Sequence, residues 1–324
     1  MAAAEGNYRI GSFYALATAA LFATQEPFSF LAAERLNSVQ FVCVTQLALL
    51  ASIPLLLARS ASRRDFIALL TKGSNLPKLA CILAIGMAGL LLYNYGLSNA
   101  HPIIISAILN LSPFWAALVA RIVSRKPIPL SPLLFFGCLA GGFLGAMAIV
   151  WSQGKTGALP PLKDLLNGAL QSGWIYAVPI PVFTALNGTL IGKWFREYDE
   201  SAAIAANFAV STLALVPTTT LLLLDRSQLP IGHPGAILLM MAGTIIAAAV
   251  GRVFYQLSLS ATDNDNGFVT MFFLLVPALT SFISLGLSLW IPSLGFSVDV
   301  GFIAGIVLNS ASLALFSLKS WGRA

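Results

Sequence analysis

Charged residues are scarce in this 324-residue sequence. Its 18 Lys and Arg and 12 Asp and Glu make up 9% of the chain, whereas an average soluble protein has about 25%. Because 58% of the residues are hydrophobic, too little polar surface exists to cover a globule in water, which excludes an ordinary soluble protein. The net charge of +6 does not indicate a nucleic-acid partner, because the basic residues are scattered at the ends of apolar runs instead of clustered on one face.

Motifs for metals, nucleotides and nucleophilic catalysis are also missing. The three cysteines, Cys43, Cys81 and Cys138, each lie in an apolar run without a partner at ligand spacing, which is typical of small core residues. The two histidines, His101 and His233, are isolated in predicted loops. No phosphate-binding loop, nucleophile elbow or HExxH sequence occurs. We therefore expect no cofactor, no metal site, no enzymatic activity and no pump driven by nucleotide hydrolysis.

Long apolar runs fill most of the chain. A membrane-spanning helix needs about 20 predominantly apolar residues, and ten runs meet or approach that length: 10–33, 38–57, 77–98, 102–120, 130–151, 172–194, 202–224, 236–259, 267–290 and 298–318. The first run follows Arg9 as in a signal peptide, but it is longer than a signal core, so we interpret it as a retained helix. The sequence predicts an all-α membrane protein with ten transmembrane helices.

The distribution of Lys and Arg predicts the orientation. With the N-terminus in the cytoplasm, thirteen of the 18 basic residues fall in inside segments and four in outside loops, while Arg252 lies within a span. This asymmetry follows the positive-inside rule. Because ten is even, we expect both termini in the cytoplasm.

The two halves of the sequence resemble each other. At an offset of 164, Pro113 matches Pro277, and Gly137-Cys-Leu-Ala-Gly141 matches Gly301-Phe-Ile-Ala-Gly305. The matches divide the chain into two five-helix repeats, 1–155 and 156–324. Five is an odd number, so the second repeat enters the membrane from the opposite side, an arrangement typical of secondary transporters with a substrate site between the halves.

Glycines at every fourth position mark the fifth and tenth runs, at Gly137, Gly141 and Gly145 and at Gly301 and Gly305. Small faces allow helix backbones to approach closely. We assign them to helix packing, either within the chain or in a homodimer.

The order of these features resembles the drug/metabolite transporter superfamily, and is most similar to its ten-helix bacterial branch, the EamA-type transporters. The segments that carry the resemblance are Tyr95–Ala100, Pro102–Ala120, Gly137–Gly145, Tyr255–Ala261, Pro277–Ser284 and Gly301–Leu308. The Gly-Glu pair that many members have after the fourth and ninth helices is absent here. The resemblance implies a central cavity around which two inverted repeats alternate access. It also implies export of a small organic solute, such as an amino acid, metabolite or drug, across the bacterial inner membrane.

Two charged residues fall inside predicted spans and are the first candidates for the transport pathway. Glu26 lies about 12 Å along the helix from Glu34 at the outer end, and the adjacent Pro27 can kink the helix and open space for a ligand. Its carboxyl group could exchange a proton for a cationic or zwitterionic substrate, or could only support the kink. Arg252 could bind a carboxylate, or its side chain could extend to the cytoplasmic surface.

Polar and aromatic residues within the spans complete the candidate pathway: Gln25, Tyr93, Asn110, Asn187 and Tyr255. Asn187 aligns with Glu26 under the repeat. Hydrogen bonds between helices are the alternative role for the amides, and lipid contact is the alternative for the aromatic rings.

Two other classes of membrane protein are the alternatives. Asp263-Asn-Asp265-Asn266 is similar to one metal-binding cluster of a prenyltransferase, but such an enzyme needs two clusters to hold Mg²⁺ and a diphosphate. A passive channel is the other alternative, although the sequence contains no recognisable selectivity filter.

Overall fold

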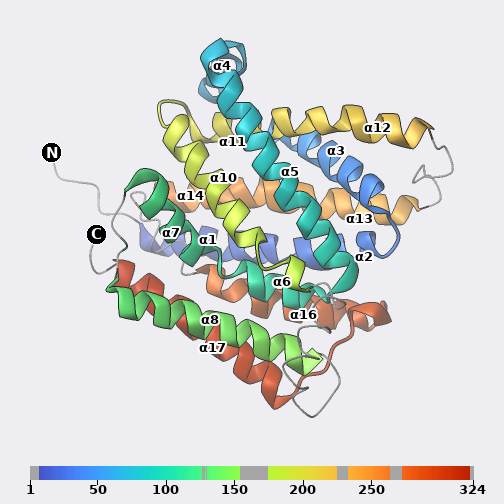
Figure 1. Ribbon diagram of the computed structural model, residues 1–324, viewed down its shortest axis with the longest axis vertical. Helices are drawn as coiled ribbons and strands as arrows, with labels where there is room; N and C mark the ends of the chain where they lie inside the picture. Colours follow the sequence, from blue (N-terminus) through green and yellow to red (C-terminus); the bar gives the residue numbers. More distant parts are fainter. Residues whose placement is uncertain are drawn as a thin grey trace.

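The computed structural model describes residues 7–125, 128, 130–153, 174–224, 233–262 and 272–321. In these ranges every regular element is helical (Figure 1). The first half contains α1 (Tyr8–Ala23), α2 (Gln25–Ala33), α3 (Ser38–Leu56), α4 (Ser60–Thr71), η1 (Gly73–Asn75), α5 (Leu76–Asn99), α6 (Pro102–Leu109), α7 (Ser112–Ser124) and α8 (Pro132–Gln153). The second half contains η2 (Trp174–Tyr176), α10 (Ile180–Trp194), α11 (Glu200–Ser211), η3 (Thr212–Ala214), α12 (Leu215–Leu224), α13 (Pro234–Ile245), η6 (Ile246–Gly251), α14 (Arg252–Ala261), η7 (Phe272–Leu275), α16 (Val276–Ser288), η8 (Pro292–Leu294) and α17 (Val300–Trp321).

Seven helical segments are long and apolar enough to cross a membrane: Ser38–Leu56, Gly73–Asn99, Pro102–Val123, Pro132–Gln153, Glu200–Leu224, Pro234–Ser258 and Val300–Ser317. Each corresponds to one of the ten predicted runs. Such lengths match the hydrocarbon thickness of a bilayer, so by length and composition the described helices are compatible with a multi-pass membrane protein.

The three remaining runs, 10–33, 172–194 and 267–290, form shorter or interrupted helices in the described residues. The first is divided between α1 and α2 at Thr24. In the other two, α10 has 15 residues and Phe272–Ser288 is a shorter apolar helix. Ten complete spans therefore remain a prediction, whereas each of the ten runs contains helix in its described residues.

The connection between the second and third runs contains a helix, α4, that the apolar pattern did not predict. It stands at the top of Figure 1 and packs against α11. Leu69 is fully buried there in a cluster with Phe195 and Ala202, and the Ser62 hydroxyl donates to Asp199 Oδ1 at 2.8 Å. Few residues of α4 are buried, so tertiary contacts, and not a long apolar face, hold this helix in place.

The glycine-rich helices α8 and α17 lie side by side at the bottom of Figure 1. A Cβ atom on Gly145 would lie 2.7 Å from the Gly305 carbonyl oxygen, and one on Gly305 would lie 2.8 Å from the Gly145 oxygen. The two backbones can be this close only because neither residue has a side chain. Gly145 and Gly305 therefore serve packing within the chain, while a homodimer through the Gly-rich helix faces stays a prediction.

Helices from the two halves interleave in one bundle. In the first half α1 and α2 pack against α14 and α13, while α5 and α7 pack against α10 and α3 packs against α11. In Figure 1, α1 begins and α17 ends on the same, left-hand side of the bundle. The predicted repeats 1–155 and 156–324 are therefore not two separately packed bodies.

Candidate functional site

Several buried polar atoms have no hydrogen-bond partner in the described part of the chain. They are Glu26 Oε2, Gln46 Oε1, Tyr93 OH, Asn187 Oδ1, Asn207 Oδ1 and Ser284 Oγ. A buried polar group without a partner costs about 1–3 kcal/mol, and in a bilayer lipid cannot satisfy it. A polar ligand or a water molecule that reaches these atoms can form the hydrogen bonds that they lack.

Glu26 lies beside a break between two helices. Pro27 has no N–H group, so the Ala23 carbonyl one turn earlier has no intrahelical donor. The Thr280 hydroxyl from α16 donates to that carbonyl at 3.3 Å and lies 3.2 Å from the Ser106 hydroxyl of α6. The helix is interrupted at Thr24, three residues before Pro27, and hydroxyl groups from α16 and α6 lie beside the break.

The Glu26 carboxyl group faces the bundle and not lipid. Its residue is only 6% exposed, and α2 packs against α5, the helix that carries Tyr93. The Tyr93 ring packs against Phe41 of α3, with ring centroids 6.4 Å apart. The structure therefore places two residues that the sequence proposed separately, Glu26 and Tyr93, on two helices that are in contact.

Two amides approach the same helix, α5, a little further along. The Gln46 side chain of α3 contacts Met87, with 3.6 Å between Nε2 and Sδ. Asn187 of α10 places its Nδ2 3.5 Å from the Cβ position of Gly86. At about 1.5 Å per residue, these contacts lie about 9–11 Å along α5 from Tyr93. The helices α2, α3 and α10 that carry three of these unpaired polar atoms all pack against α5, and we call the four residues Glu26, Gln46, Tyr93 and Asn187 the α5 polar track.

Sequence reasoning missed Gln46 and Asn207. Both are neutral amides inside predicted runs, the signal by which Gln25, Asn110 and Asn187 were selected, so the same criterion would have found them. Their burial without a complete set of partners depends on which helix face points inward, and this is a property of the packed bundle.

Arg252 and Tyr255 lie in an aromatic cluster between α1, α14 and η7. The Arg252 guanidinium lies over the Phe22 ring, 5.8 Å from its centroid, and Tyr255 stacks on Phe273 at 5.9 Å. Phe22 precedes Glu26 by four residues, about 6 Å along the helix axis. In the described chain, ion pairs join Arg64 to Asp65 and Lys72 to Glu197, so neither Glu26 nor Arg252 belongs to a salt bridge there.

Asn110 has a structural partner. Its Nδ2 donates to Asn309 Oδ1 at 2.8 Å, and Asn309 in turn donates to the carbonyl oxygens of Gly142 at 2.9 Å and Ala107 at 3.3 Å. This buried network joins α6, α8 and α17, and it is the interhelical role that the sequence left open for this residue. Gln25, at the start of α2, is half-buried.

One end of the bundle is crossed by the segment that connects α16 to α17 (residues 289–299), here called the strap. Its Ser293 hydroxyl donates to Glu34 Oε2 at 3.1 Å, and its Leu294 carbonyl lies 3.2 Å from His101 Nε2. Gln153 at the end of α8 donates to the Ser297 carbonyl at 2.9 Å. The strap therefore ties α2, α6 and α8 together.

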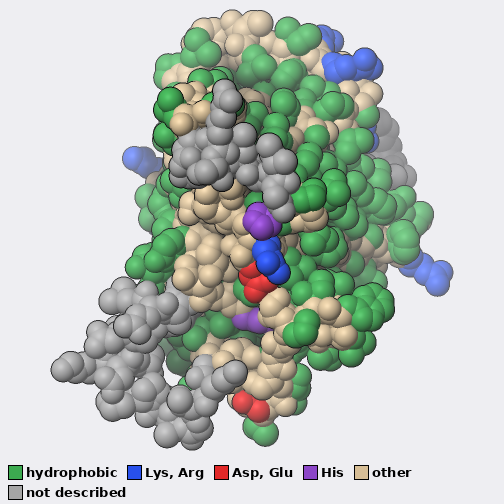
Figure 2. Space-filling view, turned by 90° about the vertical axis from the view of Figure 1, so that its right-hand side faces the viewer, with side chains coloured by type: hydrophobic (Ala, Val, Ile, Leu, Met, Phe, Trp, Pro, Cys, Tyr) green, Lys and Arg blue, Asp and Glu red, His purple; other side chains and the backbone are tan. Residues whose placement is uncertain are grey.

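His101 is neutral in this arrangement. Its Nδ1 accepts from the Ile103 N–H at 3.4 Å, so Nε2 carries the proton and donates to the Leu294 carbonyl. Burial lowers the pKa of His101 to about 4, and the hydrogen bond to Leu294 opposes this shift. Figure 2 shows a short column of basic, acidic and histidine side chains on one face of the bundle, with apolar side chains to its right.

No group of three or more His, Cys, Asp or Glu residues that could hold a metal is found in the described ranges. The segment Asp263–Asn266, which resembles half of a prenyltransferase metal site, lies outside the described residues.

Comparisons with known proteins identify a fold but no family. No family model matches the chain, and no curated protein matches it. Eight chains of solved structures are similar. One of them, described as "Crystal structure of protein", has a TM-score of 0.58, covers 96% of this chain and 96% of its own, and is 15% identical. At this identity the likeness shows the helical fold alone.

Proposed function

We propose that this protein is a secondary transporter that carries a small organic solute across the membrane by alternating access. The observation that carries the proposal is the α5 polar track, which places a carboxyl, a phenol and two amides without complete partners inside an apolar bundle. Buried polar groups of this kind in membrane proteins typically mark a substrate or ion pathway. An amino acid, a metabolite or a drug offers the polar atoms that these groups need.

The packing of the bundle supports ten spans in two inverted repeats. In the two repeats, α1 corresponds to α10, α5 to α14 and α7 to α16. When the halves are exchanged, the contact of α1 with α14 therefore becomes the contact of α10 with α5. Likewise, the contact of α7 with α10 becomes that of α16 with α1, and all four contacts occur. The pairs α3 with α11 and α8 with α17 map onto themselves. This exchange is expected if a pseudo-twofold axis relates 1–155 to 156–324, as in transporters with a site between repeats.

In this proposal Glu26 is the residue that selects and releases the solute. A buried carboxyl without a counter-ion is stable as the neutral acid or beside a cation, so protons and a cationic group compete for it. Arg252 and Tyr255 form a second position, on the other side of Phe22, where the arginine binds a carboxylate. Energy comes from an ion or solute gradient. The resemblance to EamA-type transporters favours export across a bacterial inner membrane with both termini inside.

Counterflow in proteoliposomes tests the proposal. Each set of vesicles is loaded with one unlabelled amino acid, and uptake of the same amino acid in labelled form is measured. Wild type should accumulate the label with saturable kinetics. The rate should differ between pH 6 and pH 8. Glu26→Gln should reduce the rate at least tenfold and remove the pH dependence. The matched control is Glu197→Gln, an exposed carboxyl whose Lys72 partner is also exposed, and it should transport as wild type does.

Other outcomes would assign another class. Product formation without flux would indicate a membrane enzyme, and flux that does not saturate would indicate a channel. Unchanged transport in Glu26→Gln would remove this residue from the pathway.

A further inference from the structure

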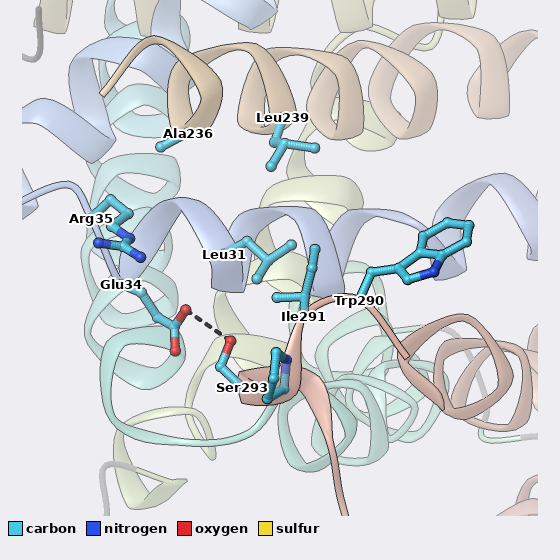
Figure 3. Close-up of a pocket in the computed structure, with 9 residues that line it drawn as sticks. Leu31, Glu34, Arg35, Ala236, Leu239, Trp290, Ile291 and Ser293 are labelled. Atoms are coloured by element: carbon cyan, nitrogen blue, oxygen red, sulfur yellow. Dashed lines mark hydrogen bonds between the residues drawn. The ribbon is translucent and has the colours of Figure 1, made fainter. Parts of the chain in front are cut away.

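A groove opens at the end of the bundle beside the strap. It has a volume of about 700 Å³ and lies between the end of α2, the first turns of α13 and residues 290–293 (Figure 3). Leu31 and Arg35 line it from the α2 side, Leu239 from α13, and Trp290 and Ser293 from the strap. This volume is within the range of about 300–1,000 Å³ that is typical of small-ligand sites.

The groove is polar at one end and apolar at the other. In Figure 3, Glu34 and Arg35 lie together at one end, Leu31 and Ile291 meet in the middle, and Trp290 lies at the opposite end. Glu34 accepts one hydrogen bond, from Ser293. Although the two charged residues are neighbours in sequence, they are not joined by an ion pair, because those in the described residues are Arg64–Asp65 and Lys72–Glu197. An acid and a base are therefore both available to a ligand at the same end.

In the ten-span arrangement of the proposed function, on which this step rests, this polarity runs along the direction in which a lipid lies in a bilayer. Glu34 and Arg35 directly follow the last residue of α2, while Leu31 lies within the helix, toward the membrane interior. Leu289 and Trp290 beside the groove are 80% and 84% exposed, although they are apolar, so lipid is the surrounding medium that suits them. A water-soluble solute would gain little from this apolar side, whereas an acyl chain would be buried against it.

We propose that the groove binds one phospholipid with a zwitterionic headgroup, such as phosphatidylethanolamine. Its phosphate pairs with Arg35, because a guanidinium matches phosphate geometry, and its ammonium group pairs with Glu34. One acyl chain lies along Leu31, Leu239 and Trp290. The bound lipid joins α2, α13 and the strap, and this role does not depend on which solute the protein carries.

Native mass spectrometry of the purified full-length protein tests the proposal. After incubation with equimolar phosphatidylethanolamine and phosphatidylglycerol, wild type should retain one phosphatidylethanolamine at collision energies that remove phosphatidylglycerol. Arg35→Gln should reduce the retained phosphatidylethanolamine about tenfold, whereas Glu34→Gln should mainly abolish the preference over phosphatidylglycerol. The control is Arg64→Gln, which removes an exposed arginine on α4 and should leave retention unchanged.

Two further measurements distinguish the sources of this ligand chemistry. A photoactivatable phosphatidylethanolamine with its reactive group in the acyl chain should label peptides that contain residues 31–35, 236–239 or 290–293. Free phosphoethanolamine at millimolar concentration should not displace the lipid. Equal retention of both lipids by wild type, unchanged retention in Arg35→Gln, displacement by the free headgroup, or labelling elsewhere would each overturn the proposal.

Discussion

At the scale of single residues, hydrogen-bond satisfaction separates the candidate residues from one another. Asn110 donates a hydrogen bond to Asn309, and Asn309 donates one to the Gly142 carbonyl. These two residues therefore stabilise the bundle. Glu26 and Asn187 each have a buried side-chain oxygen without a hydrogen-bond partner in the described residues. Composition gives these residues equal weight, because each is a polar side chain in an apolar run. Only the packed structure distinguishes a polar side chain that has a hydrogen-bond partner from one that has an unpaired buried atom.

His101 makes a pH-dependent prediction at this scale. Since burial lowers its pKa to about 4 from the usual 6.5 or so, the unfolded chain binds a proton between these values that the folded chain does not. The stabilisation is therefore present above pH 6.5 and decreases as the pH falls toward 4. Between pH 7 and pH 5 the loss should reach about 2 kcal/mol.

Thermal unfolding in detergent at pH 7 and pH 5 measures this effect. His101→Asn keeps a side-chain acceptor for the Ile103 N–H but does not titrate, so its stability should decrease less between the two pH values than that of wild type. Equal decreases in both proteins would show that His101 is not the titrating group.

At the scale of helices, the sequence predicted the helical runs well and their interruptions poorly. Apolar length locates α3, α5, α8 and α17, and glycine spacing correctly indicated that α8 and α17 use close-packed faces. The helix α4 was missed because one buried leucine and a few polar contacts position it. The π-helical turn η6 before Arg252 was missed too, since residues 246–251 have no proline and differ little from any apolar helix.

The contact of α8 with α17 makes a prediction for this scale. A Cβ atom added to Gly145 would lie 2.5 Å from the Asn309 amide nitrogen and 2.7 Å from the Gly305 carbonyl oxygen, and neither backbone atom can move alone. Gly145→Ala should therefore destabilise the protein by about 1–3 kcal/mol.

Unfolding in mixed detergent and dodecyl sulfate micelles provides the measurement, and α8 supplies its own control. Gly137 has no atom within 4 Å of its Cβ position, so Gly137→Ala should be neutral or slightly stabilising, because alanine favours helix. If the two variants had equal stability, close packing at Gly145 would not hold the helices together.

At the scale of the whole molecule, composition alone excluded a soluble fold, and the apolar runs indicated a multi-pass bundle that the structure shares. The partners of each helix could not be predicted in the same way. The Ser106–Thr280 and Asn110–Asn309 contacts join residues 174 and 199 positions apart, and a single sequence carries no signal for such pairs. For this reason the sequence named Glu26 and Tyr93 separately, and only the fold places them on two helices that are in contact.

The central claim is that the α5 polar track belongs to a pathway that opens to both sides of the membrane. Replacing Cys43, Cys81 and Cys138 with serine and placing one cysteine at Asn187 allows a direct test with a membrane-impermeant maleimide in oriented vesicles. The account predicts labelling from either side, at rates that a transported solute shifts in opposite directions. Labelling from one side only, or from neither, with a correctly folded protein, would contradict alternating access.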